Sequence, residues 1–209
     1  MNSKEETLTT WNAIAVEYEN KFMPLDIYDS SYEVFCNFVQ KASPRLLDIG
    51  CGPGNISKYL TDYFPISKIE GVDTSANMIA CAKKNVPNGH FIEMNACDIS
   101  KLTGLYDGIV SGFCLPYLAK AETGKFLMDC AEKLSANGIL YLSYVEGKYS
   151  DSHYQTGSTG HRLFFHYYET TYLIAELAKS GFKLLEKLTV GYNNATGKNE
   201  NHTILILKK

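Results

Sequence analysis

Residues 45–55, Arg-Leu-Leu-Asp-Ile-Gly-Cys-Gly-Pro-Gly-Asn, constrain the fold of this chain more than any other segment. The apolar residues Leu46, Leu47 and Ile49 predict a short buried strand, and three glycines follow it. Helical spacing of apolar residues then begins at Ile56. Glycines in such a turn allow positive φ angles and a close approach of a ligand, while the first amides of the helix point toward that ligand. The segment therefore predicts a strand, a tight turn and a helix that bind a nucleotide-like cofactor.

The spacing of the glycines distinguishes two classes of cofactor. Gly50, Gly52 and Gly54 give G-x-G-x-G, whereas the dinucleotide fingerprint is G-x-G-x-x-G and its loop binds a pyrophosphate. Asp48 stands two residues before the first glycine, where its carboxylate would repel a pyrophosphate and attract a cation such as the α-ammonium of a methionine-type cofactor. The sequence thus favours S-adenosylmethionine over NAD. The residues of this segment expected to bind it are Asp48, Gly50, Cys51, Gly52 and Asn55.

Length and charge limit the classes of function. With 209 residues, 45% of them apolar, the chain can bury one sizeable core, and we expect a single domain over 1–209. Its 20 basic and 23 acidic residues give a net charge of -3, so the positive excess of a nucleic-acid binder is missing. No segment resembles a secretion signal or a membrane span of ~20 apolar residues. We expect a cytoplasmic protein with a small-molecule partner, and its oligomeric state stays open.

The six cysteines indicate neither a metal site nor a disulfide framework. They form no C-x-x-C pair and never lie closer than 15 residues apart in the sequence. Buried or half-buried thiols of a reducing compartment are the expected state, and no metal ion is expected.

Two helices are expected within residues 1–42, ahead of the first strand. Apolar and aromatic residues recur at helical spacing in two runs that Pro24 separates. Most of these side chains, including Trp11 and Phe22, we assign to packing, because aromatic stripes are usually core faces. Tyr18 we assign to the cofactor, since a buried hydroxyl needs a polar partner and a cofactor carboxylate would provide one.

Strand-like and helix-like segments alternate with short connections after residue 55. The expected strands cover residues 68–73, 90–94, 106–111 and 139–144. Ser75 is expected to cap the helix that follows the first of these strands. The alternation predicts right-handed crossovers and a doubly wound parallel sheet of the α/β class. Two later runs, 182–190 and 202–207, have no helix between them and are expected to pair antiparallel.

Acidic residues follow the strands at the edge where such sheets bind ligands. Asp73 comes 23 residues after Gly50, close to the ~20 expected for a carboxylate that binds a ribose diol with both oxygens. Asp98 follows the third strand, where it is placed to accept a hydrogen bond from an exocyclic amine such as adenine N6.

With these motifs the chain resembles the class I S-adenosylmethionine-dependent methyltransferases. The resemblance rests on residues 46–54, 71–75 with Met78, 95–99 and 106–111. It implies a Rossmann-like sheet of about seven strands whose last strand is antiparallel, with the N-terminal helices covering the site. The further cofactor contacts it implies are Thr74 and Met78 near the ribose, Cys97, Asp98 and Ile99 near the adenine, and Gly112 and Phe113 at the methionine end.

The sequence does not identify the methyl acceptor or the accepting atom. Methyltransferases that act on exocyclic or amide nitrogens often carry [Asp/Asn/Ser]-Pro-Pro-aromatic after the fourth strand, but residues 111–114 read Ser-Gly-Phe-Cys here. DNA bases and glutamine are thereby disfavoured. Residues 146–168 form a long segment without a helical stripe, and such segments in compact domains are often lids. We expect this one to lie over the acceptor side.

One part of this segment offers candidate acceptor contacts. If residues 159–168 are extended, Arg162, Phe164, His166 and Tyr168 share one face. We expect Arg162 to orient an anionic acceptor group and His166 to act as the catalytic general base, since an imidazole titrates near neutrality. The alternative is that both are rim residues of a half-buried strand. The expected substrate contacts are Tyr117, Arg162, His166 and Tyr168.

Three functions remain open. The first is methyl transfer from S-adenosylmethionine to a small molecule, with S-adenosylhomocysteine as the product. The second is a catalytically silent regulator that binds S-adenosylmethionine, because binding and turnover use the same cofactor residues. The third is a NAD(P)-linked oxidoreductase, which Asp48 and the missing third glycine of the dinucleotide fingerprint disfavour.

Overall fold

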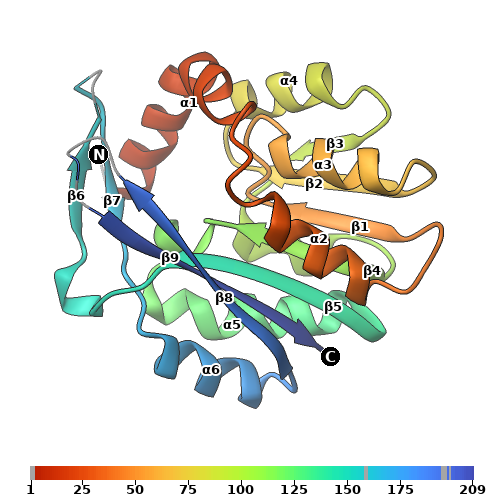
Figure 1. Cartoon of the computed structure of the whole chain (residues 1–209). Helices are drawn as coiled ribbons and strands as arrows, with labels where there is room; N and C mark the ends of the chain where they lie inside the picture. Colours follow the sequence, from red (N-terminus) through yellow and green to blue (C-terminus); the bar gives the residue numbers. More distant parts are fainter. Residues whose placement is uncertain (1–2, 158–159, 194–196, 198) are drawn as a thin grey trace.

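A seven-stranded sheet runs through the middle of the molecule, and helices lie on both of its faces (Figure 1). The computed structural model describes residues 3–157, 160–193, 197 and 199–209. The strands of the sheet are β1 (Arg45–Ile49), β2 (Lys68–Asp73), β3 (His90–Glu93), β4 (Tyr106–Gly112), β5 (Leu134–Val145), β8 (Lys183–Asn193) and β9 (Asn199–Lys208). The α-helices are α1 (Ser3–Phe22), α2 (Asp29–Phe38), α3 (Asn55–Tyr63), α4 (Ala76–Asn85), α5 (Lys120–Lys133) and α6 (Thr170–Lys179). Both expected N-terminal helices are therefore present.

The order of the strands is β3-β2-β1-β4-β5-β9-β8. The strands from β1 to β5 pair in parallel, β9 pairs antiparallel with β5, and β8 pairs antiparallel with β9. The prediction of a Rossmann-like, doubly wound sheet of seven strands with a closing antiparallel hairpin is confirmed. Because the chain returns from β3 to place β4 beside β1, the strand order reverses between β1 and β4. Sheets of this kind bind ligands outside the carboxyl ends of the strands at that reversal.

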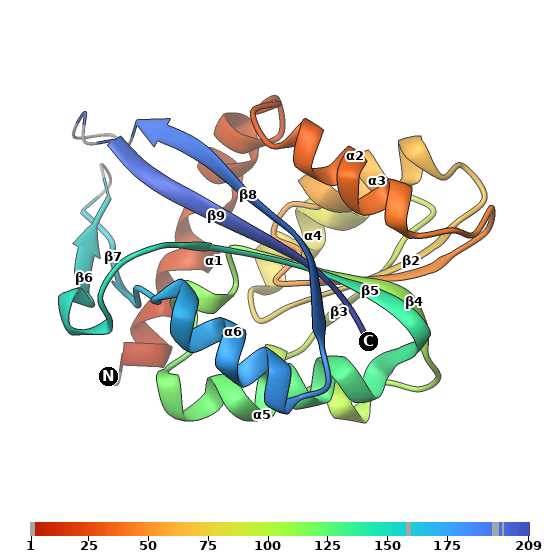
Figure 2. The same cartoon turned by 60° about the horizontal axis from the view of Figure 1, so that its bottom comes forward.

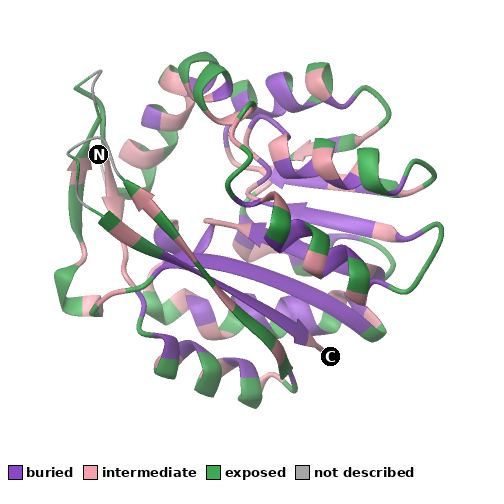
Figure 3. Cartoon of the chain, viewed as in Figure 1, coloured by how far each residue is buried: buried purple, intermediate pink, exposed green. Residues whose placement is uncertain are grey.

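The central strands are apolar because helices cover them on both faces. Leu46, Leu47 and Ile49 of β1 are all at most 1% exposed, and the whole centre of the sheet is buried (Figure 3). The helices α2, α3 and α4 lie on one face of the sheet, and α5 and α6 lie on the other (Figure 2). Their side chains contribute to two separate core clusters, one on each face. This two-sided burial explains why the strands read as continuous apolar runs in the sequence.

The strand β5 begins earlier than the sequence pattern indicates, at Leu134 and not at residue 139. Leu134 pairs with Tyr106 of β4, after which the register between the two strands shifts. Within the irregular part, Asn137 adopts a φ of 64°. The apolar pattern covers only the regular part of the strand, so the prediction of its start was wrong.

A small hairpin and α1 stand beside the carboxyl edge of the sheet. The hairpin consists of the antiparallel strands β6 (His153–Thr156) and β7 (Arg162–Phe165), and it follows the short 3-10 helix η3 (Tyr149–Asp151). The helix α1 contacts both α4 and β7, and β7 also contacts the 3-10 helix η2 (Leu115–Tyr117). In Figure 1 the N-terminal helix lies between the hairpin and α4.

Candidate functional site

The glycine turn after β1 needs glycine at each of its three positions. Gly50, Gly52 and Gly54 have φ angles of 70°, 52° and 87°, in the left-handed region that other residues rarely adopt. The amide of Gly50 donates to the carbonyl oxygen of Val72 at 2.8 Å, which folds the turn against the end of β2. A Cβ atom on Gly50 would lie 3.1 Å from Cβ of Cys114. The turn therefore combines a left-handed backbone with close packing.

Asp73, at the end of β2, organises the turn from the neighbouring strand. Its Oδ2 accepts from the amide of Gly52 at 3.0 Å, and its Oδ1 accepts from the amide of Ser75 at 2.8 Å. Burial raises the pKa of Asp73, while the amides of Ser75, Gly52 and Thr74 act in the opposite direction. A carboxylate offers about four acceptor positions, so Asp73 keeps capacity for a further partner. Ser75 caps α4, as predicted, by accepting from the amide of Met78.

A cavity of about 340 Å³ lies at the carboxyl ends of β1, β2 and β4. Its position at the reversal of strand order matches the expected place of a ligand. The structure brings ten of the predicted site residues together around it: Tyr18, Gly50, Gly52, Asp73, Thr74, Met78, Gly112, Phe113, Tyr117 and His166. The glycine turn, the ribose-side residues and one part of the acceptor segment thus share one space.

Phe113 forms part of the cavity wall in an unusual conformation. Its φ of 54° is positive although it carries a side chain, and its amide donates to the hydroxyl of Ser143 at 3.0 Å. Its ring packs against Tyr28 and His202, with centroids 5.3 Å and 4.8 Å away. Such strained backbone is often found at functional sites, where the surrounding packing holds it in place.

Asp48 lies behind the turn and does not line the cavity. It is 0% exposed, and its Oδ2 accepts from the hydroxyl of Ser57 at 2.7 Å. Its Oδ1 has no hydrogen-bond partner among the described residues. Burial raises the pKa of Asp48 to about 7, although the hydrogen bond from Ser57 opposes the shift. Its predicted contact with the cofactor ammonium stays a prediction.

The predicted adenine side is displaced by a few residues from the cavity wall. Met94, Asn95 and Ala96 line the cavity, and the following residues enter the 3-10 helix η1 (Ala96–Lys101). Asp98 forms an ion pair with Lys101 at 2.8 Å and its side chain is 45% exposed. The predicted residues placed outside the cavity lining are Asp48, Cys51, Asn55, Cys97, Asp98, Ile99, Arg162 and Tyr168.

The helix α1 contributes more of the cavity wall than the sequence indicated. Leu8 and Trp11 line the cavity together with Tyr18. Trp11 packs edge-on against Tyr18 and Tyr117, with ring centroids 5.2 Å and 5.3 Å away. We assigned Trp11 to packing, and it packs as expected, but it also borders the cavity. An apolar stripe on a helix predicts burial without telling whether the partner is a core or a ligand site.

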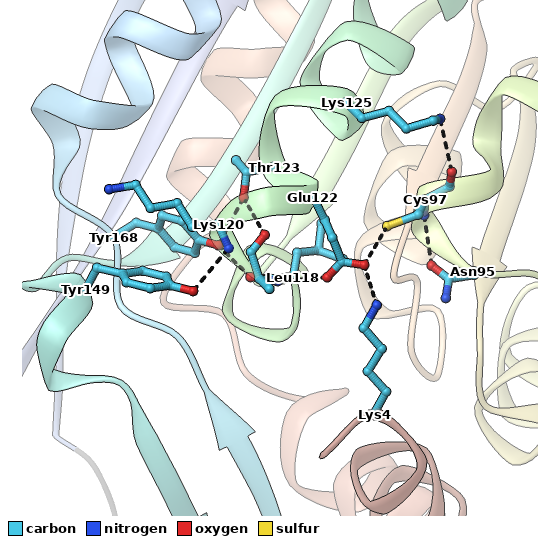
Figure 4. Close-up of polar contacts among 11 residues, drawn as sticks. Lys4, Asn95, Cys97, Leu118, Lys120, Glu122, Thr123, Lys125, Tyr149 and Tyr168 are labelled. Atoms are coloured by element: carbon cyan, nitrogen blue, oxygen red, sulfur yellow. Dashed lines mark hydrogen bonds and ion pairs between the residues drawn. The ribbon is translucent and has the colours of Figure 1, made fainter. Parts of the chain in front are cut away.

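Ion pairs and hydrogen bonds hold α1 over the cavity. Near its start, Lys4 forms an ion pair with Glu122 of α5, whose carboxylate also accepts from the thiol of Cys97 (Figure 4). Two residues later Glu6 forms an ion pair with Arg162. Thr10 donates to the carbonyl oxygen of that same arginine at 2.6 Å. These contacts connect α1 to both α5 and β7.

The four residues expected to share one face of the acceptor segment separate into two groups. Phe164 and His166 line the cavity. Arg162 turns instead to Glu6, with its guanidinium 4.4 Å from the ring centroid of Tyr154. Tyr168 is 1% exposed and donates to the carbonyl oxygen of Leu118. The alternation therefore holds for the two residues at the centre of the run.

His166 is enclosed by rings. Its imidazole stacks on Tyr149 with an interplanar angle of 8° and lies 4.8 Å from the ring centroid of Phe164. Its Nδ1 is buried and has no hydrogen-bond partner in the described part of the chain. Burial lowers the pKa of His166 below its ordinary value of 6.5, so the ring is neutral at neutral pH. A neutral imidazole beside a cavity is able to accept a proton.

Within residues 3–157, 160–193, 197 and 199–209, no group of three His, Cys, Asp or Glu side chains is arranged to hold a metal ion. None of the helices there has the length and apolar character needed to cross a lipid bilayer.

Parts of the sequence are similar to known methyltransferases. A family model described as a methyltransferase domain matches residues 46–138. A trans-aconitate 2-methyltransferase of Paracidovorax citrulli is 33% identical over 124 residues, which is 59% of this chain and 47% of that protein. The match covers less than half the length of each of the first curated relatives.

Two solved structures share the fold of the chain. An S-adenosylmethionine-dependent methyltransferase from Methanosarcina mazei has a TM-score of 0.72 at 18% identity, with 84% of this chain and 96% of the other covered. A 1,6-didemethyltoxoflavin-N1-methyltransferase from Burkholderia thailandensis, with bound 1,6-didemethyltoxoflavin and S-adenosylhomocysteine, has a TM-score of 0.71 at 14% identity. That match covers 100% of this chain and 91% of the other.

Proposed function

We propose that this chain, which carries a class I S-adenosylmethionine-dependent methyltransferase domain, transfers the methyl group of S-adenosylmethionine to a small-molecule acceptor. The observation that carries the proposal is the joint placement of Gly52 and Asp73 at one cavity, where the carboxylate meets the glycine turn. A ribose diol needs such a carboxylate, and the amino-acid end of the cofactor needs a close approach to the backbone.

The residues present fit this cofactor. A Cβ atom added to Gly52 would stand 4.0 Å from the ring of Tyr18, so the missing side chain leaves room between the turn and α1. Asp73 would hold the ribose, and Met94, Asn95 and Ala96 would border the adenine. Tyr18 and Phe113 would border the methionine end, with Asp48 supplying negative charge from behind the turn.

Alignment and exclusion of water are the main contributions of the protein to this reaction. When bound, the cofactor supplies a methyl group on a positively charged sulfur. The helix α1 lines one side of the cavity and would exclude water there, which favours a step in which that charge disappears. The rings of Trp11, Tyr117 and Phe164 would orient the acceptor, and orientation alone accounts for much of the rate of such transfers.

We assign the proton transfer to His166, a neutral imidazole of the cavity wall that is able to accept a proton. Tyr117 is proposed to contact the acceptor directly. Arg162 and Tyr168 are proposed to affect acceptor binding indirectly, by positioning residues of the cavity wall. Arg162 forms an ion pair with Glu6 of α1, and Tyr168 donates a hydrogen bond to the carbonyl oxygen of Leu118. Residues 1–42 and 146–168 are then a cap and a lid on a single domain.

Two of the similar proteins support a small acceptor. The relative from Paracidovorax citrulli is named for trans-aconitate, and the neighbour from Burkholderia thailandensis holds 1,6-didemethyltoxoflavin. Neither compound is assigned to this chain as its acceptor, which we describe only as a small molecule. The modest volume of the cavity, about 340 Å³, is in the range of small-ligand sites.

The single tryptophan of the chain offers a direct test of the cofactor. Trp11 lines the cavity, so its fluorescence is expected to change when S-adenosylmethionine or S-adenosylhomocysteine binds. NAD and NADP serve as matched competitors, and tighter binding of either would reject the proposal in favour of an oxidoreductase. A metabolite mixture incubated with methyl-labelled S-adenosylmethionine then tests turnover. Cofactor binding without any label transfer would indicate a regulator.

A further inference from the structure

One wall of the cavity is built almost entirely from rings. Trp11 of α1, Tyr117 of η2 and Phe164 of β7 line it together with His166. Trp11 and Tyr117 meet edge-on at 87°, and Phe164 lies 4.8 Å from His166, measured between ring centroids. Flat, apolar side chains of this kind favour ring compounds, which they contact by stacking or edge-on.

A second layer of rings fixes the first. Phe165 packs edge-on against Tyr117, with centroids 5.9 Å apart, and Tyr149 stacks on His166 at 5.4 Å. The amide of His166 also donates to the carbonyl oxygen of Pro116 at 2.8 Å, which ties the end of β7 to η2. The ring wall is therefore supported from behind by packing and by one backbone hydrogen bond.

Permanent positive charge is scarce at this wall. Of the lining residues that the structure describes, Lys4 alone carries such a charge, and its ammonium forms an ion pair with Glu122. Arg162, which we expected to orient an anionic acceptor, forms an ion pair with Glu6 and lies outside the lining. His166 is kept neutral by its burial, which lowers its pKa.

Negative charge is present in the same space. Asp73 and Glu5 line the cavity, and Asp48 lies buried behind the glycine turn. A compound with two or three carboxylates would be surrounded by acidic groups and would find no free cation in the described lining. Burying a carboxylate without a cation or several hydrogen bonds is strongly unfavourable.

On the premise of the proposed methyl transfer, we infer that the acceptor is a planar ring compound without negative charge and not a polycarboxylate. The ring wall selects its shape, and the paired Lys4 and Arg162 leave an anion without a partner. The acceptor inferred for this chain thereby differs in charge and shape from trans-aconitate, the compound for which the relative from Paracidovorax citrulli is named.

Two ring compounds of nearly equal shape and one polycarboxylate test the charge preference. Protein loaded with S-adenosylhomocysteine is titrated by calorimetry with 2-naphthylmethanol, 2-naphthoate and trans-aconitate. The neutral 2-naphthylmethanol is expected to bind at least about tenfold more tightly than the anion of the same shape. Equal or tighter binding of 2-naphthoate or trans-aconitate would overturn the inference, as would the absence of binding by 2-naphthylmethanol.

Two phenylalanines on different elements test the place of binding. Phe164 of β7 lines the cavity, whereas Phe38 of α2 packs against the core outside the cavity lining, so Phe164→Leu and Phe38→Leu form a matched pair. Loss of one ring contact is expected to weaken 2-naphthylmethanol binding about three- to tenfold in Phe164→Leu. The affinity is expected to stay within about twofold in Phe38→Leu, because that ring is not part of the cavity wall. Equal losses in the two variants would overturn the assignment of this wall.

Failure of the inference is distinguishable from failure of the proposed function. If the unmodified protein binds no S-adenosylhomocysteine, as read from Trp11 fluorescence, both are rejected. If it binds S-adenosylhomocysteine and the loaded protein then prefers anions, only the inference about the acceptor is rejected.

Discussion

The carboxylate of Asp73 accepts a hydrogen bond from the backbone amide of Gly52, 3.0 Å away. This contact joins the end of β2 to the turn that follows β1. From the sequence we expected Asp73 to bind a ribose, and the structure adds a second task, since the same side chain holds the turn in shape. Asp73 therefore affects both the fold of the site and its affinity.

Replacing Asp73 is expected to lower both the affinity for the cofactor and the stability of the fold. Asp73→Ala removes the contact to a ribose diol, and we expect S-adenosylhomocysteine affinity to fall by about 2–3 kcal/mol, or about thirty- to a hundredfold. It also leaves the amides of Gly52 and Ser75 without their acceptor, which is expected to lower the free energy of unfolding by about 1–3 kcal/mol. Calorimetry and urea unfolding measure the two effects.

The exposed Asp62 provides the matched control for this change. Its side chain is 66% exposed and forms an ion pair with Lys58 four residues away, so Asp62→Ala is expected to leave cofactor affinity unchanged. An S-adenosylhomocysteine affinity in Asp73→Ala equal to that of the unmodified protein would contradict the ribose assignment.

Asp48→Asn separates the charge of Asp48 from its shape. We expect weaker binding of S-adenosylmethionine, by about tenfold or more, because the negative charge behind the turn is lost. Calorimetry with S-adenosylmethionine and with NAD measures the effect. If the variant bound NAD more tightly than S-adenosylmethionine, our choice of cofactor would be wrong.

The same variant is expected to change how stability depends on pH. Burial raises the pKa of Asp48 from 3.8 to about 7. Its contribution to stability is therefore fully present below pH 3.8 and is lost as the pH rises through about 7. Asp48→Asn removes this loss, so its melting temperature is expected to fall less than that of the unmodified protein between about pH 5 and about pH 8. Equal pH dependence in both proteins would show that Asp48 does not titrate in this range.

His166→Gln tests the general base once an acceptor is known. We expect the maximal rate to fall by about a hundredfold or more, because glutamine cannot take the proton. In the unmodified protein the rate is expected to decline as the pH falls below 6.5, through the lowered pKa of His166. His153 on β6 is exposed and lies outside the cavity lining, so His153→Gln is the control. A rate and pH profile unchanged in His166→Gln would eliminate this base.

The ion pair between Glu6 and Arg162 is expected to slow the release of the product. Glu6→Gln weakens the attachment of α1 to β7, and S-adenosylhomocysteine is expected to dissociate about two- to fivefold faster, the scale of a partly exposed pair. Added salt is expected to accelerate release in the unmodified protein more than in the variant. Stopped-flow fluorescence of Trp11 measures both rates. Identical release rates with and without Glu6 would mean that α1 does not gate the cavity.

His202 is expected to make the fold sensitive to acid. It is 6% exposed, its Nδ1 lies 2.6 Å from the hydroxyl of Tyr28, and burial lowers its pKa although Glu200 acts in the opposite direction. Its contribution to stability is present above 6.5 and is lost as the pH falls through the lowered pKa. In urea unfolding from neutral pH to about pH 5, His202→Gln is expected to lose less stability than the unmodified protein. A steeper loss in the variant would reverse this assignment.

The sheet and the glycine turn could be predicted because their causes are local. A strand buried on both faces gives a continuous apolar run such as Leu46 to Ile49, and a left-handed turn requires its glycines. Ser75 caps α4 through contacts within four residues, so its role was equally visible. The start of β5 could not be predicted, because the irregular stretch around Asn137 has no repeating apolar pattern.

The acceptor side was harder to predict because its contacts join distant parts of the chain. Glu6 and Arg162 are 156 residues apart in the sequence, and Lys4 and Glu122 are 118 apart. No sequence pattern within one segment indicates that Arg162 forms an ion pair with Glu6. Trp11 shows the same limit, because its helical spacing predicts burial but does not tell what it is buried against.

The position of β9 between β5 and β8 has a consequence for synthesis. Both strands that pair with β9 precede it in the chain, so a growing polypeptide leaves the ribosome with the edge of β5 open until residues 199–208 follow. That edge, from Ile139 to Val145, is almost wholly buried in the finished protein. An open apolar edge is a template for pairing with another chain. A nascent chain stalled before Asn199 would therefore expose this edge of β5 to pairing with other chains.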